Sequence, residues 1–187
     1  MAERIADLAE KTGRCGRLMT RRRLLGLAFA GMMLGTSAQA KQVAVRYLQL
    51  PMHTFMVTRS GSGKVIGHVE FTQTLHGDEA TMRLTFRFSD GSIDDETTTF
   101  RQQGFFHLIR DRHIETGPFF GKTVDFAVDA TTGTATSRTT GRNGKAAVET
   151  EHINLPNDLA NGIVGTLLVN VPETTTPFRV GILAPVD

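Results

Sequence analysis

Apolar and polar residues alternate along most of this chain, and this period of two residues constrains the fold more than any other feature. In the segment 64–76, one side of an extended chain would carry Val65, Gly67, Val69, Phe71 and Leu75. In the segment 80–88, the corresponding side would carry Ala80, Met82, Leu84, Phe86 and Phe88. Successive side chains of a β-strand point to opposite faces, so both segments are predicted to be strands with one buried face.

The same pattern predicts further strands at 93–102, 105–115, 122–129, 134–140 and 145–153. Short turn sequences separate them, such as Gly77-Asp78, Asp90-Gly91 and Thr132-Gly133. Because consecutive strands joined by short turns usually pair, we predict a mainly β fold, an antiparallel meander of roughly seven to nine strands. Its apolar face must be covered, so we expect the sheet to curl into a barrel or half-barrel with one C-terminal helix packed on it.

Helical spacing occurs near the C-terminus. Leu159, Ile163 and Leu167 recur every four residues, which predicts an amphipathic helix. Asn157 or Asp158 is expected to cap its start, and Pro172 to end it. A closing strand is expected at 178–183.

Residues 1–40 are typical of an export signal rather than of a folded domain. Arg21-Arg22-Arg23 precedes an apolar run over 24–34, and the small residues Ala38 and Ala40 follow. A basic segment, an apolar core of about 7–15 residues and a small-x-small end define a secretory signal peptide. The run is shorter than the roughly 20 residues of a membrane-spanning helix. We therefore predict cleavage after Ala40 and a single β-rich domain over 41–187, which is not an integral membrane protein.

The order Thr20-Arg21-Arg22-Arg23-Leu24-Leu25 resembles a twin-arginine signal, with Arg21 and Arg22 as the export motif. A general secretory signal with a strongly basic start is the alternative. Met19 is an alternative start of the chain, because a compact signal runs from it to Ala40. Both routes predict a periplasmic or secreted protein that meets the export machinery as a partner.

The charges outside the signal argue against a nucleic-acid binder. Residues 1–40 hold seven of the 21 Lys and Arg residues but only three of the 19 Asp and Glu residues, so residues 41–187 have a net charge of −2. Binding to nucleic acid requires a basic surface on the folded part. The single cysteine, Cys15, also lies in the signal, so the mature chain is predicted to form no disulfide and no thiolate metal site.

Histidines and acids give only weak signals for chemistry. His68 and His76 share a predicted strand face, but about 26 Å of strand separates them, too far to share a metal ion. His107, Asp111 and His113 would lie on one face of 105–115, and a His–Asp pair can act as a general base. No nucleophile motif accompanies them, so a charged outer face is the expected interpretation.

Two further polar clusters have a structural and a functional interpretation. Asp90, Asp94, Asp95 and Glu96 are hard oxygen ligands, but their spacing departs from the calcium-loop pattern, so we expect a solvated hairpin. Asn157, Asp158 and Asn161 join the last long strand to the helix. They would either cap the helix and form turns, or form the polar mouth of an apolar cavity. We expect no catalytic residues, no metal and no cofactor.

Part of the chain resembles a group of secreted bacterial proteins of unknown function. The carriers of this resemblance are Gly117-Pro118-Phe119, Val124-Asp125, Asp129-Ala130-x-x-Gly133 and Leu155-Pro-Asn-Asp-Leu-Ala-Asn-Gly162, the last matching a Leu-Pro-x-Asp-Leu-Ala-Asn-Gly stretch. At the level of the fold alone, a long curled meander with one packed helix is similar to periplasmic half-barrels that carry lipid or lipoprotein. The resemblance brings no catalytic residue, and fold does not imply function.

Three functions are compatible with the sequence. The favoured one is an exported envelope protein that binds an apolar ligand or lipid in the curled sheet, through Val69, Phe71, Leu84, Phe86, Asn157, Asp158 and Asn161. This hypothesis fails if Leu159, Ile163 and Leu167 fill the inner face completely. The alternatives are a structural or interaction module of the envelope without a small ligand, and a hydrolase that uses His107 or His113 with Asp111. The sequence favours a non-enzymatic role.

Overall fold

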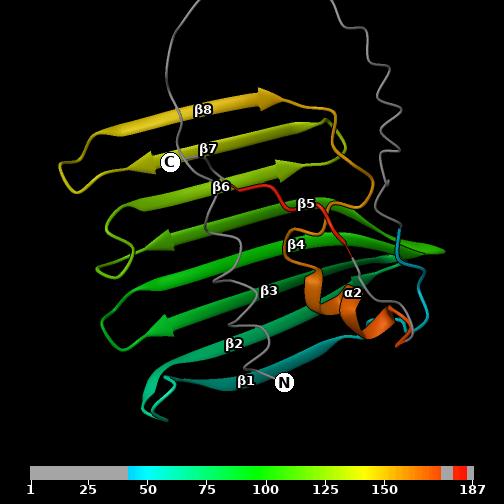
Figure 1. Ribbon diagram of the computed structural model, residues 1–187, viewed down its shortest axis with the longest axis horizontal. Coiled ribbons are helices and arrows are strands. Elements are labelled where there is room, and N and C mark those ends of the chain that lie inside the picture. The colour runs from blue at the N-terminus through cyan, green and yellow to red at the C-terminus, as the bar shows by residue number, and fades with distance from the viewer. Residues whose placement is uncertain (1–41, 174–178, 185–187) are drawn as a thin grey trace, which may run out of the picture. The chain divides into compact units, whose positions relative to one another are not determined.

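The computed structural model describes residues 42–173 and 179–184. Within them lie one sheet of eight antiparallel strands and a short helix (Figure 1). The elements are β1 (Met52–Arg59), β2 (Val65–His76), β3 (Glu79–Phe88), β4 (Ile93–Gln103), β5 (Phe105–Thr116), β6 (Thr123–Asp129), β7 (Thr134–Thr140), β8 (Ala146–His152) and α2 (Val164–Asn170). The spatial order is the sequence order, so the predicted meander is confirmed. The sheet is open, with β1 and β8 at its edges.

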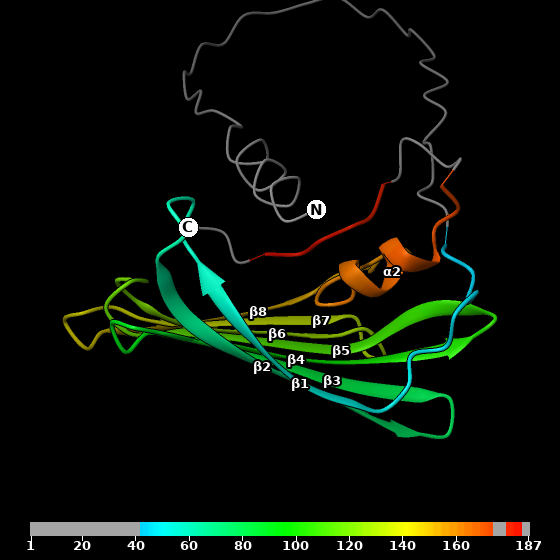
Figure 2. The same ribbon diagram turned by 90° about the horizontal axis from the view of Figure 1, so that it is seen from below.

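The register confirms the faces predicted for β2 and β3. Val69 lies opposite Phe86, and Phe71 lies opposite Leu84. We call the face of the sheet that carries these four residues the inner face, and α2 packs on it (Figure 2). The opposite face is the outer face. The alternation does not delimit β1, because this strand places apolar residues on both of its faces, such as Phe55 and Met56.

The core lies between the inner face and the segment that contains α2. Ile163 and Leu167 pack against Met82, Phe100 and Phe106. Leu159 packs in a second cluster with Leu108, Val124, Phe126 and Val128. Burial of these side chains supplies most of the driving force for folding, at about 25 cal/mol per Å² of apolar surface. The late helical segment thus covers part of the inner face, as the sequence predicts.

The helix is shorter than predicted. It begins at Val164, with Ile163 at the N-cap position and no side-chain cap, so the expected caps Asn157 and Asp158 are wrong. Gly162, with φ of +67°, interrupts the helical path before that point. Val171 is extended (ψ 131°), as expected of a residue before proline, and ends the helix as predicted. Of the predicted closing strand, the described part forms a parallel bridge between Gly181 and Leu159. No helix among the described residues is long and apolar enough to cross a membrane.

A β-bulge in β5 changes which side chains face inward. Leu108 pairs with Phe100, but the next pair is Arg110 with Thr99, so Ile109 is an extra residue. Phe106 and Leu108 are buried before the bulge, and Asp111 is buried after it. The prediction that His107 shares a face with Asp111 and His113 is therefore wrong, because His107 alternates with Phe106 and Leu108 and points outward.

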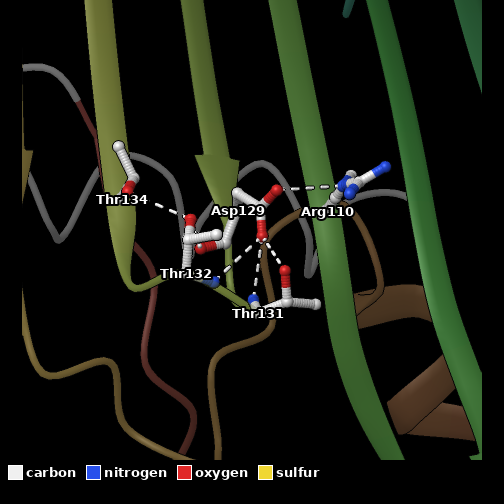
Figure 3. A network of polar contacts seen from close by, with 5 residues as sticks. All are labelled: Arg110, Asp129, Thr131, Thr132 and Thr134. Atoms are coloured by element: carbon white, nitrogen blue, oxygen red, sulfur yellow. Dashed lines mark hydrogen bonds and ion pairs between the residues drawn. The ribbon is translucent and has the colours of Figure 1, made fainter.

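The turn between β6 and β7 is organised by one carboxylate. Oδ1 of Asp129 accepts hydrogen bonds from the backbone N–H groups of Thr131 (2.9 Å) and Thr132 (3.2 Å), while Oδ2 accepts one from Nε of Arg110 at 3.0 Å (Figure 3). Oδ1 also accepts a hydrogen bond from the Thr131 hydroxyl. This bond contributes most to lowering the pKa of Asp129 to about 2, and the bonds from Arg110 and the two N–H groups add to it. The carboxylate thus fixes the turn and ties it to β5.

Replacing this carboxylate should make the protein less stable in a pH-dependent way. A depressed pKa means that the folded state favours the ionised form, so the stabilisation is present above pH 4 and is lost as the pH falls towards 2. For Asp129→Asn we expect a loss of about 1 kcal/mol at pH 7, because asparagine keeps an acceptor for the turn but loses the charge that strengthens the bonds from Thr131 and Arg110. Urea unfolding of both proteins measures this difference, and a difference that stays constant from pH 7 to pH 2 would contradict the assignment.

Candidate ligand-binding site

A cavity of about 360 Å³ lies between the inner face of β4–β6 and the segments that cross it. The sheet contributes Glu96, His113 and Phe126 to its wall. The crossing segments contribute Ala160, Asn161, Gly162, Val164, Gly165, Ile182, Leu183 and Ala184. Its lining is mostly apolar, with a few polar groups on one side, which is the usual composition of a small-molecule site.

The polar side of the cavity comes from adjacent strands. Cross-strand pairing puts Glu96 opposite His113 and Asp94 opposite Glu115. Nε2 of His113 lies 2.7 Å from Oδ1 of Asp94 and 3.9 Å from Oε1 of Glu115. This hydrogen bond to Asp94 is the main reason why the pKa of His113 is raised to about 9. At neutral pH the imidazole is therefore a cation that donates to Asp94.

The surroundings of Glu96, which lines the same cavity, disfavour its ionised form. Burial, and then the negative charge of Asp111, raise its pKa to about 7. The charge of His113 opposes this shift without cancelling it. A titratable side chain that lines a cavity and has a strongly perturbed pKa is a candidate functional group.

Asp111 is a second buried acid on the same face. It is 2% exposed, and its Oδ1 accepts a hydrogen bond of 2.7 Å from the hydroxyl of Thr98. Its Oδ2 has no hydrogen-bond partner among the described residues. Burial raises the pKa of Asp111, and the Thr98 hydroxyl opposes this only in part. An unpaired buried carboxylate oxygen costs free energy, so its presence beside the cavity calls for an explanation.

The arrangement of Asp94, His113 and Glu115 fits an ion-pair cluster better than a metal centre. Their potential ligand atoms lie within 4.8 Å of one another. A metal ion there would have to displace the proton that the hydrogen bond to Asp94 holds on His113. Without a metal, these three residues interact as charged groups.

The structure places the sequence-predicted ligand residues in two groups. Val69, Phe71, Leu84 and Phe86 all lie on the inner face of β2 and β3, where Phe71 packs against the core beneath α2. Asn157, Asp158 and Asn161 lie in the crossing segment, and of these three Asn161 lines the cavity. Its amide bonds both backbone groups of Leu183, at 2.8 and 2.9 Å, and so holds the second crossing segment over the cavity.

Other predicted residues are separated or lie elsewhere. The acidic group of Asp90, Asp94, Asp95 and Glu96 does not act as a unit, because Asp95 faces outward and binds Arg83 at 2.8 Å. His68 alternates with the inward-facing Val69 and so faces outward. The signal residues Arg21, Arg22, Ala38 and Ala40 lie outside the described residues.

Sequence reasoning missed Glu96 and His113 as partners. Glu96 lies on β4 and His113 on β5, the two strands of one hairpin, and they lie opposite each other only because of the bulge at Ile109. A signal that could have found Glu96 is its spacing of two residues from Asp94, which puts both acids on one face of a strand. The residues opposite them on the neighbouring strand, Phe86 and Leu84, are apolar.

No known protein family, curated protein or solved structure matches this chain.

Proposed function

We propose that this chain is an exported envelope protein, periplasmic or secreted, that binds an apolar or amphipathic small molecule on the inner face of its sheet. The observation that carries the proposal is the cavity of about 360 Å³, which combines Phe126, Val164 and Ile182 with the polar groups Glu96 and His113. Leu159, Ile163 and Leu167 are buried and fill the neighbouring part of the inner face, but the cavity remains beside them.

A second cavity of about 220 Å³ adjoins the first and extends the available space. It shares Phe126, Leu183 and Ala184 with the first cavity and continues to Glu149 and Glu151 of β8. An elongated ligand could therefore lie across β4–β8, with its apolar part against Phe126 and Leu183. This shape suits a chain-like molecule better than a compact one.

The proposal predicts that a bulky side chain at Gly165 blocks binding. Gly165 lines the cavity, and a Cβ atom there would meet no atom within 4 Å, so Gly165→Phe can fold and place its ring in the cavity space. With the uncharged fluorescent probe N-phenylnaphthylamine, the full-length protein should show saturable binding, and Gly165→Phe should weaken it at least about tenfold.

The matched control is Gly61→Phe, the same change at a loop glycine that also has open space around it. It adds the same apolar surface far from the cavity, so it should bind the probe as the unchanged protein does. Equal probe binding by the Gly165→Phe variant, or the absence of saturable binding by the unchanged protein, would contradict the proposal.

The alternative of an interaction module is favoured by the edge strand β1. Phe55, Met56 and Val57 are 71%, 45% and 50% exposed, and among the described residues no strand pairs with the free side of β1. Exposed apolar edges are typical places for pairing with another chain. Of the two histidines of the hydrolase alternative, His107 points away from Asp111, whereas His113 shares the inner face with Asp111 and is bound to Asp94.

A further inference from the structure

The two faces of the sheet differ in charge. Within β2–β8 the six arginines all lie on the outer face, as register and alternation place them: Arg83, Arg87, Arg101, Arg110, Arg112 and Arg138. These strands contain no lysine. The inner face of β4–β8 carries the acids Asp94, Glu96, Asp111, Glu115, Glu149 and Glu151. The base on that face is His113.

The outer charges are largely compensated by local ion pairs. Arg83 binds Asp95 at 2.8 Å, and Arg112 binds Asp125 at 2.9 Å. Arg101 binds Glu79 at 2.7 Å. Within strands β4–β8, His113 is the base among the inner acids, and Asp94 engages it, so acids outnumber bases on the inner face of these strands.

The bulge in β5 sets the part of this asymmetry that lies on β5. In a register without the bulge, Ile109 would pair with Thr99, and Arg110 and Arg112 would point inward. The extra residue turns Asp111 and His113 inward instead and leaves both arginines on the outer face, where they bind Asp129 and Asp125. A bulge that replaces two inward cations with a buried acid and a histidine is a feature that re-aims side chains at a site.

We propose that the site takes an amphipathic molecule whose polar end is a cation, an amine or a quaternary ammonium. This inference rests on the proposed function and narrows its ligand class. Glu96 and Phe126 line the same cavity, so a positive charge there meets both a carboxylate and an aromatic ring. Aromatic faces attract cations. The cation His113 lies in the same wall, but its charge is paired with Asp94 at 2.7 Å. Asp111 is buried on the same inner face, one pair further along β4 and β5, and adds a second acidic side chain next to Glu96.

Isothermal titration calorimetry with three dodecyl amphiphiles tests this class, the two ionic ones below their micelle concentrations and the alcohol below its solubility limit. The full-length protein should bind dodecyltrimethylammonium at least about tenfold more tightly than uncharged dodecanol, and dodecanoate more weakly than either. Glu96→Gln should reduce the affinity for the cation about tenfold and leave that for dodecanol unchanged. The matched control is Glu70→Gln, the same change on the outer face, where Glu70 contacts His53 at 2.9 Å; it should alter neither affinity.

The outcomes separate this inference from the proposed function. If dodecanol or dodecanoate binds as tightly as the cation, the cationic class is wrong and the apolar site stands. If cation binding is unchanged in Glu96→Gln, the assigned recognition group is wrong. If none of the three amphiphiles binds, the proposed function itself fails.

Discussion

Gly162→Ala is expected to destabilise the protein by about 3–5 kcal/mol, in the range reserved for severe steric conflicts. Gly162 has φ of +67°, where any side chain is strained. A methyl group there would also overlap the hydroxyl of Thr98 and come within 2.9 Å of Oδ1 of Asp111. Both groups are buried on the sheet and hydrogen-bonded to each other, so neither can move away without breaking that bond. The crossing segment would have to lift from β4 and β5.

The change is measured by urea unfolding, with Gly165→Ala as the matched control three residues later. A methyl group at Gly165 meets open space, and alanine is a better helix former than glycine, so the control should gain up to about 1 kcal/mol. Because the crossing segment roofs the cavity, Gly162→Ala should also weaken probe binding. An unfolding free energy within about 0.5 kcal/mol of the unchanged protein would show that the close packing of Gly162 on Thr98 is wrong.

Glu96→Gln is expected to stabilise the protein at neutral and higher pH. Burial and Asp111 raise the pKa of Glu96 to about 7. A raised pKa in an acid means that ionisation is easier in the unfolded chain, so the penalty is absent below the usual pKa near 4.5 and is complete above pH 7. One pKa unit corresponds to about 1.4 kcal/mol. With part of the shift screened by solvent, we expect a gain on the order of 2 kcal/mol at pH 8 and none at pH 4.

Unfolding free energies of Glu96→Gln and Glu70→Gln at pH 4 and pH 8 measure this effect. The outer-face control should differ little from the unchanged protein at both values, because its charge is exposed. A Glu96→Gln variant that is less stable than the unchanged protein at pH 8 would refute the assigned burial of this acid. A gain in stability together with a loss of cation binding would show that the folded protein retains an unfavourable charge because the ligand needs it.

Most of the sheet could be predicted from the sequence because its signal is local. The alternation that ends at His76 and resumes at Ala80 defines a hairpin and the inward faces of β2 and β3, including Val69, Phe71, Leu84 and Phe86. Burial of Leu159, Ile163 and Leu167 likewise follows from their spacing. Each of these predictions depends only on whether neighbouring side chains point to the same side.

The site could not be predicted in the same way because it depends on register across strands. The bulge at Ile109 decides whether Arg112 or His113 lies opposite Glu96. The sequence around Ile109 does not mark it as a bulge, because an apolar residue at this position also fits an ordinary strand. The helix start fails for a related reason. Asn157 and Asp158 are good capping residues, but the bridge between Leu159 and Gly181 and the left-handed Gly162 keep the chain non-helical until Val164.

The central claim, that the cavity on the inner face holds a small molecule, is tested most directly by native mass spectrometry with organic extraction. The protein is recovered from the envelope of cells that express the full chain, alongside the Gly165→Phe variant. We predict a stoichiometric adduct on the unchanged protein, an extract that contains an amphipathic cation, and loss of the adduct in Gly165→Phe. A mass equal to that of the polypeptide alone, with nothing apolar in the extract, would contradict the account and turn attention to β1 as an interaction edge.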